Sequence, residues 1–337
     1  NAHINLRTPD WWYKQIHSRF LVCESAVYEG AAVYVGQALA AVKVEAKAPR
    51  IEPPERTDVL EARLNGTKAR FVVVNDMTKY RVQSLFTKEP ITIEWINRMK
   101  PGEVLFDIGA NVGSYAIWAG RRGVKVYAFE PAAQNYELLC QNIELNNLSN
   151  VTAYCAALSD RARLDVLHLA SRVPGGSCNE FGQAVGHTLE ARPTPFKQGC
   201  VGLRLDDLDL PQPDHIKIDV DGFEHLVIDG ALHTLKRAKS VLVEVNENLE
   251  PHRAMVVRLC EMGFDYRAHQ VDQARRQSGA FKGCAEYLFT RERDEMDWLV
   301  DAIMRMPLVN EPFPYLYLPN VFSTDLYAEI QKNLDVA

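Results

Sequence analysis

The sequence has no C-x-x-C pair and no long apolar run, and these two absences narrow the class of protein. Its seven cysteines stand singly along the chain, so neither a zinc site nor a disulfide framework is predicted, and a reducing, cytoplasmic location is expected. The most apolar stretch near the beginning, residues 31–42, is shorter than the roughly 20 residues that a membrane-spanning helix needs. We therefore expect a packed helix there and no interaction with a membrane.

A concentrated basic surface is also missing. The chain has 38 Lys and Arg residues against 44 Asp and Glu residues, a net charge of −6, and its densest basic runs, at 120–122 and 274–277, are short. Nucleic acid is therefore not predicted as the main partner. The 337 residues are 47% hydrophobic and 24% charged, as is usual for a folded protein of one large domain with extensions, or of two domains.

Three parts are predicted along the chain. Residues 1–90 are expected to form an N-terminal helical extension and a β-hairpin, residues 91–291 the main domain, and residues 292–337 a C-terminal helix and the start of a further domain. The first residue is not Met, and no signal-peptide pattern is present. We therefore expect the sequence to be a fragment of a longer, multi-domain protein.

The extension has its own internal signals. Residues 9–46 have a helical pattern, and three prolines between 48 and 56 indicate a linker. Two β-prone runs then surround Asn65-Gly66, the dipeptide that favours a type I′ hairpin turn.

From residue 91 onward, strand-like and helix-like segments alternate. This rhythm predicts an α/β fold with a doubly wound, Rossmann-like parallel sheet. A continuous helix is expected over 222–236, and the glycine- and proline-rich segment 171–200 is expected to be a long binding loop. The predicted parallel strands are 103–109, 125–130, 151–158, 215–220 and 240–246, followed by a terminal antiparallel pair at 264–268 and 285–291.

The turn after the first of these strands has an unusual composition. It reads D-x-G-x-N-x-G, with Asp107 at the end of the strand and Gly109, Asn111 and Gly113 in the turn. Glycine and asparagine tolerate positive φ, and glycine also lets a ligand approach the backbone closely. In open α/β sheets such turns bind ligands at the carboxyl ends of the strands.

The glycine spacing distinguishes between two classes of cofactor that such a turn could bind. A dinucleotide-binding turn requires G-x-G-x-x-G, and here Asn111 and Ser114 occupy the second and third glycine positions. A second acid, Glu130, ends the next strand, where a carboxylate can accept hydrogen bonds from both hydroxyls of a ribose. Together with an aspartate suited to an amino-acid ammonium group, the pattern favours S-adenosylmethionine. An NAD-dependent oxidoreductase, a purely structural tight turn, and a non-catalytic module within a larger protein remain alternatives.

Four stretches in the same order resemble the FkbM-type family of S-adenosylmethionine-dependent methyltransferases, and the resemblance covers residues 90–291. The stretches are LFDIGANVGSYAIWAG, VYAFEPAAQNYELLCQNIELNNLSNVTAYCAALSD, IKIDVDGFEHLVIDGA and VLVEVNE. The resemblance implies a class I methyltransferase domain over 91–291, with S-adenosyl-L-methionine as cofactor and oxygen as the usual methyl acceptor. One departure is Asp221, where the family more often has Glu.

The resemblance also implies roles for particular residues. The turn residues line the methionine end of the cofactor, Glu130 holds the ribose, and Ala157 lies near the adenine. The turn residues concerned are Asp107, Gly109, Asn111 and Gly113.

Three charged residues on the fourth and fifth strands are the predicted catalytic group. Lys217 and Asp219 are two residues apart and therefore lie on the same face of their strand. The strand is expected to be buried on both faces, so Lys217 needs an acidic partner, either Asp219 or Glu244. Asp219 ends its strand beside the cofactor turn, where it could position the acceptor or accept its proton. A purely structural ion pair is the alternative for Asp219 and Lys217.

Other candidates for the chemistry are weaker. His187 and His225 are more often solvated residues than catalysts. No metal is predicted, although Asp219, Glu244 and Asn246 gather at one edge, and Glu224 is expected to interact with a helix N-terminus instead. The expected activity is O-methylation of a hydroxyl on a small or carrier-bound metabolite, such as a sugar or polyketide-like group.

Overall fold

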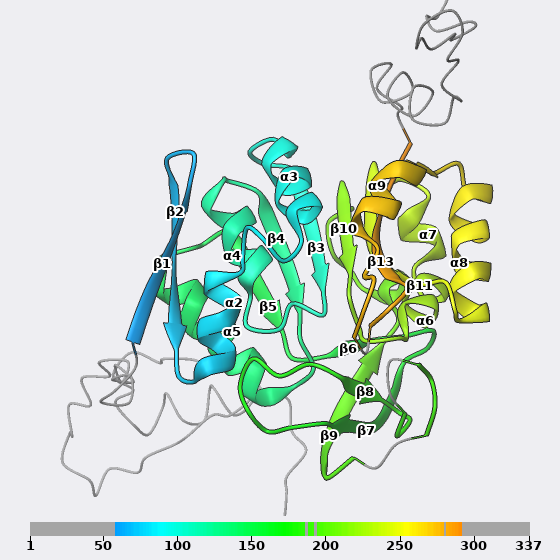
Figure 1. The fold of residues 1–337 in the computed structure, drawn as a ribbon, viewed down its shortest axis with the longest axis horizontal. Helices are drawn as coiled ribbons and strands as arrows, with labels where there is room; N and C mark the ends of the chain where they lie inside the picture. The colour runs from blue at the N-terminus through cyan, green and yellow to red at the C-terminus, as the bar shows by residue number, and fades with distance from the viewer. Residues whose placement is uncertain (1–57, 186–187, 192–193, 280, 292–337) are drawn as a thin grey trace, which may run out of the picture. The chain divides into compact units, whose positions relative to one another are not determined.

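The computed structural model describes residues 58–291 apart from 186–187, 192–193 and 280 (Figure 1). The chain divides into two compact units, Asn1–Glu55 and Arg56–Ala337, and everything described below belongs to the second. The helix and linker expected before residue 57 and the segment 292–337 lie outside the described residues. Within those residues, no helix is long and apolar enough to cross a membrane.

The central sheet has seven strands in the order β12-β13-β11-β10-β3-β4-β5 (Figure 1). The five strands from β11 to β5 pair in parallel, while β13 is antiparallel to both of its neighbours. The predicted Rossmann-like sheet with a terminal antiparallel pair is confirmed. The strands are β3 (Val104–Ile108), β4 (Lys125–Phe129), β5 (Val151–Tyr154), β10 (His215–Ile218), β11 (Ser240–Asn246), β12 (Asp265–Tyr266) and β13 (Cys284–Thr290).

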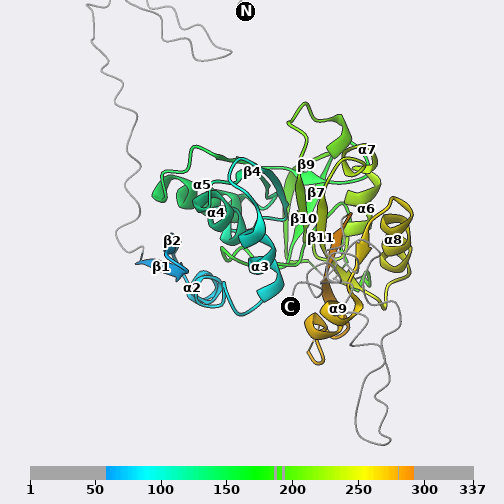
Figure 2. The ribbon, with the colours of Figure 1, turned by 90° about the horizontal axis from the view of Figure 1, so that it is seen from above.

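Helices cover both faces of this sheet (Figure 2). On one face, Ile216 of β10 belongs to a hydrophobic cluster with Leu259 of α8; on the other, Leu105 of β3 belongs to a cluster with Trp118 of α4. Strand residues therefore alternate between two buried surfaces, as a doubly wound sheet requires. The helices are α2 (Asp76–Gln83), α3 (Pro90–Arg98), α4 (Ser114–Arg121), α5 (Ala133–Leu145), α6 (Glu224–Asp229), α7 (Leu232–Leu235), α8 (Glu250–Glu261) and α9 (Ala268–Ala274).

The predicted hairpin is confirmed as β1 (Asp58–Leu64) and β2 (Thr67–Val73). Asn65 and Gly66 both have positive φ, 49° and 80°, as the type I′ turn demands. Phe71 of β2 is buried in the same hydrophobic cluster as Trp118. The hairpin is therefore packed onto the sheet domain and shares its core.

Asn142 of α5 links this hairpin to the turn after β3. The side chain is fully buried; its Oδ1 accepts a hydrogen bond from the Val72 N–H at 2.8 Å, and its Nδ2 donates to the Val112 carbonyl at 2.8 Å. One side chain thus satisfies two buried backbone groups from elements 40 residues apart in sequence.

The helix predicted over 222–236 is not continuous. It breaks at Gly230 and Ala231 into α6 and α7. The carboxylate of Asp206 accepts hydrogen bonds from the N–H groups of His233 and Thr234, both at 2.8 Å, and so caps a new helix start. The apolar spacing alone could not reveal this distant cap.

The segment predicted as one strand at 151–158 and the predicted loop at 171–200 were also partly wrong. The strand divides after Tyr154, and its second half joins a second, four-stranded sheet in the order β6-β9-β7-β8. Leu167 and Leu169 of β7 are buried in a small hydrophobic cluster with Ala157. The alternation of polar and apolar residues in this segment therefore belongs to a strand that was not predicted. These strands are β6 (Ala157–Leu158), β7 (Arg163–Leu169), β8 (Asn179–Phe181) and β9 (Phe196–Leu203).

Replacing Asn142 by Ala is expected to lower the free energy of unfolding by about 2–4 kcal/mol, because two buried backbone groups lose their partner. Urea denaturation measures the change. Gln141→Ala is the control, since it removes only an exposed hydrogen bond to Glu137, and it should cost less than about 1 kcal/mol. Equal losses in the two variants would contradict the role given to Asn142.

Candidate functional site

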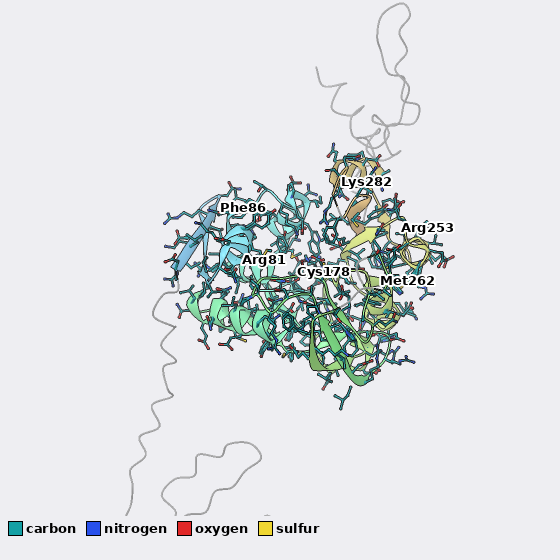
Figure 3. The ribbon with its side chains drawn as sticks, turned by 60° about the horizontal axis from the view of Figure 1, so that its bottom comes forward. Arg81, Phe86, Cys178, Arg253, Met262 and Lys282 are labelled. Atoms are coloured by element: carbon teal, nitrogen blue, oxygen red, sulfur yellow. The ribbon has the colours of Figure 1, made fainter. Side chains whose placement is uncertain are left out.

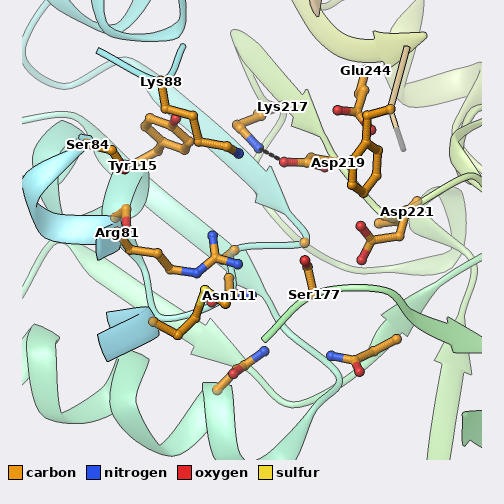
Figure 4. A pocket seen from close by; sticks show the side chains of 18 of the residues that line it. Arg81, Ser84, Lys88, Asn111, Tyr115, Ser177, Lys217, Asp219, Asp221 and Glu244 are labelled. Atoms are coloured by element: carbon orange, nitrogen blue, oxygen red, sulfur yellow. Dashed lines mark hydrogen bonds and ion pairs between the residues drawn. The ribbon is translucent and has the colours of Figure 1, made fainter. Parts of the chain in front are cut away.

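A cavity of about 450 Å³ opens at the carboxyl ends of β3, β4, β10 and β11 (Figure 4). The turn after β3 and the start of α4 form one wall, and the ends of β10 and β11 form another. One face of α2 and the residues Arg276, Ser278, Gly279 and Phe281 complete it. The parallel sheet thus brings together residues that lie up to 135 positions apart in sequence, from Gly109 to Glu244.

The turn after β3 adopts the backbone that its sequence predicted. Gly109, Asn111 and Gly113 have φ values of 83°, 53° and 86°. A Cβ on Gly109 would lie 1.8 Å from the backbone oxygen of Asp219, and one on Gly113 would lie 2.4 Å from a methyl group of Leu139. Gly109 and Asn111 line the cavity, whereas Gly113 serves the packing of α4 against α5.

Glu130 follows β4 and lies directly beneath this turn. Its carboxylate accepts hydrogen bonds from the N–H groups of Asn111 and Ala132, at 2.8 and 2.9 Å, and it also lines the cavity. Burial raises the pKa of Glu130 to about 7, although those N–H groups favour the ionised form. The geometry leaves it beside the cavity as a hydrogen-bond acceptor held in one orientation.

Asp107 is buried below the turn and does not itself line the cavity. Neither oxygen of its carboxylate has a hydrogen-bond partner among the residues described. Burial raises the pKa of Asp107 to about 6 against the opposing charge of Lys217, which lies opposite it in the β3–β10 register. An orphaned buried acid next to a ligand-binding turn is a group that a cationic ligand would stabilise.

Ala157 lies in a second, smaller cavity of about 30 Å³. Apolar side chains such as Leu158 and Phe223 line it, and it shares Gly109 and Val220 with the larger cavity. The sequence-predicted adenine position is therefore separate from the main cavity but adjacent to it, and the adenine assignment stays a prediction.

Lys217 and Asp219 form the ion pair that the sequence analysis offered as one of two possibilities. Lys217 is 2% exposed, and its Nζ lies 3.1 Å from Asp219 Oδ2 and 5.2 Å from the ring centre of Tyr115. Burial alone would lower the pKa of Lys217, but Asp219 and Asp107 more than reverse this and raise it. Burial likewise opposes ionisation of Asp219, yet Lys217 holds the pKa of Asp219 below its usual range.

Glu244 does not pair with Lys217. It faces Glu286 across the antiparallel β11–β13 pair, and Arg276 lies 2.9 Å from Glu244 and 3.0 Å from Glu286. Burial raises the pKa of Glu244 well above its ordinary value, and nearby Asp219 adds to this effect. One guanidinium thus compensates two adjacent buried acids.

Sequence reasoning missed several residues of this site. Glu89, only 2% exposed, precedes α3, and its carboxylate lies 2.5 Å from Lys88 Nζ and interacts with the hydroxyl of Tyr115. Glu89 itself is not part of the cavity lining, but Lys88 and Tyr115, which it contacts, are, and so are Arg81 of α2 and Arg276. In the sequence, the position of Glu89 directly before Pro90 was the one available signal for these residues. Nothing in the sequence linked Glu89 to strands more than 100 residues away.

The glycine-rich segment 173–179 crosses beside the cavity, as expected for a binding segment. The Asn111 side chain donates to the Gly176 carbonyl at 2.8 Å, and the Cys178 N–H donates to Asp221 at 2.6 Å. Figure 3 labels Cys178 at this position. His187 lies outside the described residues, and His225 is absent from the described cavity lining.

Asp219, Glu224 and Glu244 bring one carboxylate oxygen each to within 4.8 Å of one another, a spacing that a metal ion could bridge. Each acid already has protein partners. Asp219 and Glu244 pair with Lys217 and Arg276, and Glu224 accepts from the N–H groups that precede α6, as predicted. Asn246, the other candidate, is not part of the group. The donor set is therefore accounted for without a cation.

These features fit a nucleoside with a positively charged amino-acid tail. The glycine turn allows close approach, Glu130 offers an acceptor for ribose hydroxyls, and Asp107 is an acid without a hydrogen-bond partner in the described part of the chain. S-adenosylmethionine has each of the complementary groups.

Glu130 should make cofactor binding depend on pH. Ribose hydroxyls donate to the ionised carboxylate, so below about pH 7 Glu130 must lose its proton when the ligand binds. The affinity for S-adenosylhomocysteine should therefore fall by up to about tenfold for each unit that the pH is lowered below 7. Titration calorimetry from pH 6 to 8 measures this. Glu130→Gln should bind more weakly and lose that dependence, whereas Glu137→Gln, an exposed acid on α5, should keep it. The same pH slope in Glu130→Gln would refute the ribose assignment.

Several known proteins that are similar to this chain are methyltransferases. The family model described as "Methyltransferase FkbM domain" matches residues 107–266. Hexuronic acid methyltransferase AglP of Haloferax volcanii is 23% identical over 197 residues, which cover 56% of this chain and 75% of that protein. The 31-O-demethyl-FK506 methyltransferase FkbM of Streptomyces tacrolimicus is 38% identical over 66 residues, 19% of this chain and 25% of that protein.

Two further matches are shorter or more distant. The tRNA (guanine(37)-N(1))-methyltransferase of Leishmania major is 46% identical over 55 residues, 16% of this chain and 8% of that protein. The solved structure of methyltransferase FkbM from Methylobacillus flagellatus has 15% identity and a TM-score of 0.37, covering 64% of this chain and 56% of that chain. Residues 107–266 of this chain are a methyltransferase domain of the FkbM family, and S-adenosylmethionine is its methyl donor.

Proposed function

We propose that this protein transfers the methyl group to an oxygen atom, a hydroxyl on a small or carrier-bound metabolite such as a sugar or polyketide-like group. The observation that carries the proposal is Asp219, a partly exposed carboxylate at the cavity wall, held by Lys217 and touching the cofactor turn at Gly109. The names of two relatives, a hexuronic acid methyltransferase and a 31-O-demethyl-FK506 methyltransferase, support the same substrate class.

The proposed chemistry needs an aligned acceptor and a proton acceptor. S-adenosylmethionine, when bound, supplies a methyl group on a positively charged sulfur. Asp219 stays ionised because Lys217 lowers its pKa, so it can accept a hydrogen bond from the acceptor hydroxyl and orient it. Glu244, whose pKa burial raises, is the stronger base when ionised and the better candidate to take the proton.

Cavity size and charge support a small acceptor over RNA. Four acidic residues balance four basic ones among the described residues of the lining, and the whole chain has a net charge of −6. Such balance lacks the excess positive charge that a phosphate backbone requires. The 55-residue match to a tRNA methyltransferase covers 8% of that protein, too little to carry over its substrate.

The wider organisation is part of the proposal. The catalytic domain would cover 91–291, with residues 1–90 as an extension that supplies α2 to the cavity and residues 292–337 leading into a further domain. Five described cysteines are free thiols, which supports a reducing, cytoplasmic location: Cys140, Cys155, Cys200, Cys260 and Cys284.

Asp219→Asn should lower turnover about 10²-fold, the scale of one acid–base or positioning contribution, while affinity for S-adenosylhomocysteine stays within about twofold. Release of S-adenosylhomocysteine with a panel of sugars and hexuronic acids measures turnover, and calorimetry measures affinity. The control is Asp209→Asn, an exposed acid outside the cavity, which should behave as the unmodified protein. Wild-type turnover in Asp219→Asn would make Asp219 a structural residue.

A further inference from the structure

The cationic side chains of the cavity differ in how their charge is compensated. Four basic residues are among the described residues that line it. Three have acidic partners within ion-pair distance, whereas Arg81 has no acidic partner in the described part of the chain. The compensated residues are Lys217 with Asp219, Lys88 with Glu89, and Arg276 with Glu244 and Glu286.

One side of the Arg81 guanidinium is fixed. Its Nε donates a hydrogen bond to the Gly175 carbonyl at 2.6 Å, and the Gly175 N–H in turn donates to Asn135 Oδ1 at 2.8 Å. No described group accepts from the two terminal nitrogens. Figure 4 shows the guanidinium extending from α2 across the cavity toward Asn111. The two terminal nitrogens therefore face the cavity as oriented donors, and their positive charge acts on Asp221 of the cavity wall without forming an ion pair with it.

We propose that Arg81 is a carboxylate-binding residue of this cavity. A guanidinium held at Nε presents its terminal nitrogens as a planar fork, the geometry that matches the two oxygens of a carboxylate. Two carboxylates can reach the cavity: that of the cofactor's methionine tail and that of an acidic acceptor. Binding of an acceptor carboxylate rests on the proposed function, whereas binding of the methionine carboxylate requires only that S-adenosylmethionine is the cofactor.

The neighbours of Arg81 favour the methionine carboxylate. Asn111 connects the two regions, because its backbone N–H donates to Glu130 and its side chain donates to Gly176, the residue after the partner of Arg81. Three hydrogen bonds, through the Gly175–Gly176 backbone and Asn111, therefore connect Arg81 to the acid assigned to the ribose. The amino-acid tail continues from that ribose, so a carboxylate-binding group is needed on this side of the turn.

Arg81→Gln tests the proposal, because glutamine can still donate to the Gly175 carbonyl but has no charge and no fork. Lys79→Gln is the matched control, an equal charge loss at an exposed position of α2 outside the cavity. Calorimetry is run with S-adenosylhomocysteine and with 5′-methylthioadenosine, which lacks the amino-acid tail. We expect Arg81→Gln to weaken S-adenosylhomocysteine binding about 10- to 100-fold, with 5′-methylthioadenosine and the control unchanged.

A second measurement tests whether Arg81 binds the carboxylate of an acidic acceptor rather than that of the methionine tail. If S-adenosylhomocysteine affinity is unchanged, binding of glucuronate and of glucose to the protein saturated with S-adenosylhomocysteine is compared. Selective loss of glucuronate binding in Arg81→Gln would support the proposal with an acidic acceptor. No change in either measurement, or equal weakening of S-adenosylhomocysteine and 5′-methylthioadenosine, would overturn it. Failure of the unmodified protein to transfer a methyl group to any hydroxylated acceptor would contradict the proposed function without affecting the calorimetric result for Arg81.

Discussion

The close contact between Gly109 and Asp219 determines how this site is built. Gly109 turns the chain out of β3 with positive φ, and the space that a Cβ would need is taken by the backbone oxygen of Asp219, the residue after β10. A side chain there would force the two strand ends apart. The cofactor turn and the proposed catalytic carboxylate are thus adjacent through backbone contact, and the rest of the cavity is arranged around this junction.

Charge compensation on the same sheet face is the second constraint. Lys217 is buried on a central strand, so its ammonium group requires acids, and Asp219 and Asp107 provide them from two neighbouring positions. Arg276 does the equivalent for Glu244 and its neighbour on β13. The pairing with Lys217 keeps Asp219 ionised where it lines the cavity, whereas the pKa of Glu244 stays raised in spite of Arg276.

The sequence predicted the sheet and turn well because their signals are local. Strand periodicity, the type I′ hairpin dipeptide and the glycines at 109 and 113 each act within a few residues. It failed where structure depends on distant groups. Asp206 divides a helix that the spacing predicted as continuous. The packing of the N-terminal elements brings Arg81 into the cavity lining and Glu89 against the lining residue Lys88. The second sheet was missed because β6 and β8 are only two and three residues long, and because glycines and prolines in the segments on either side of β8 favoured a loop.

The central claim is that a nucleoside lies across the carboxyl ends of the strands with its ribose bound by Glu130. A crystal structure of the protein with S-adenosylhomocysteine tests it most directly. We expect both ribose hydroxyls to lie within about 3.2 Å of the Glu130 carboxylate and the sulfur to face Asp219. A ribose bound elsewhere, or a cavity that stays empty at saturating ligand, would contradict it.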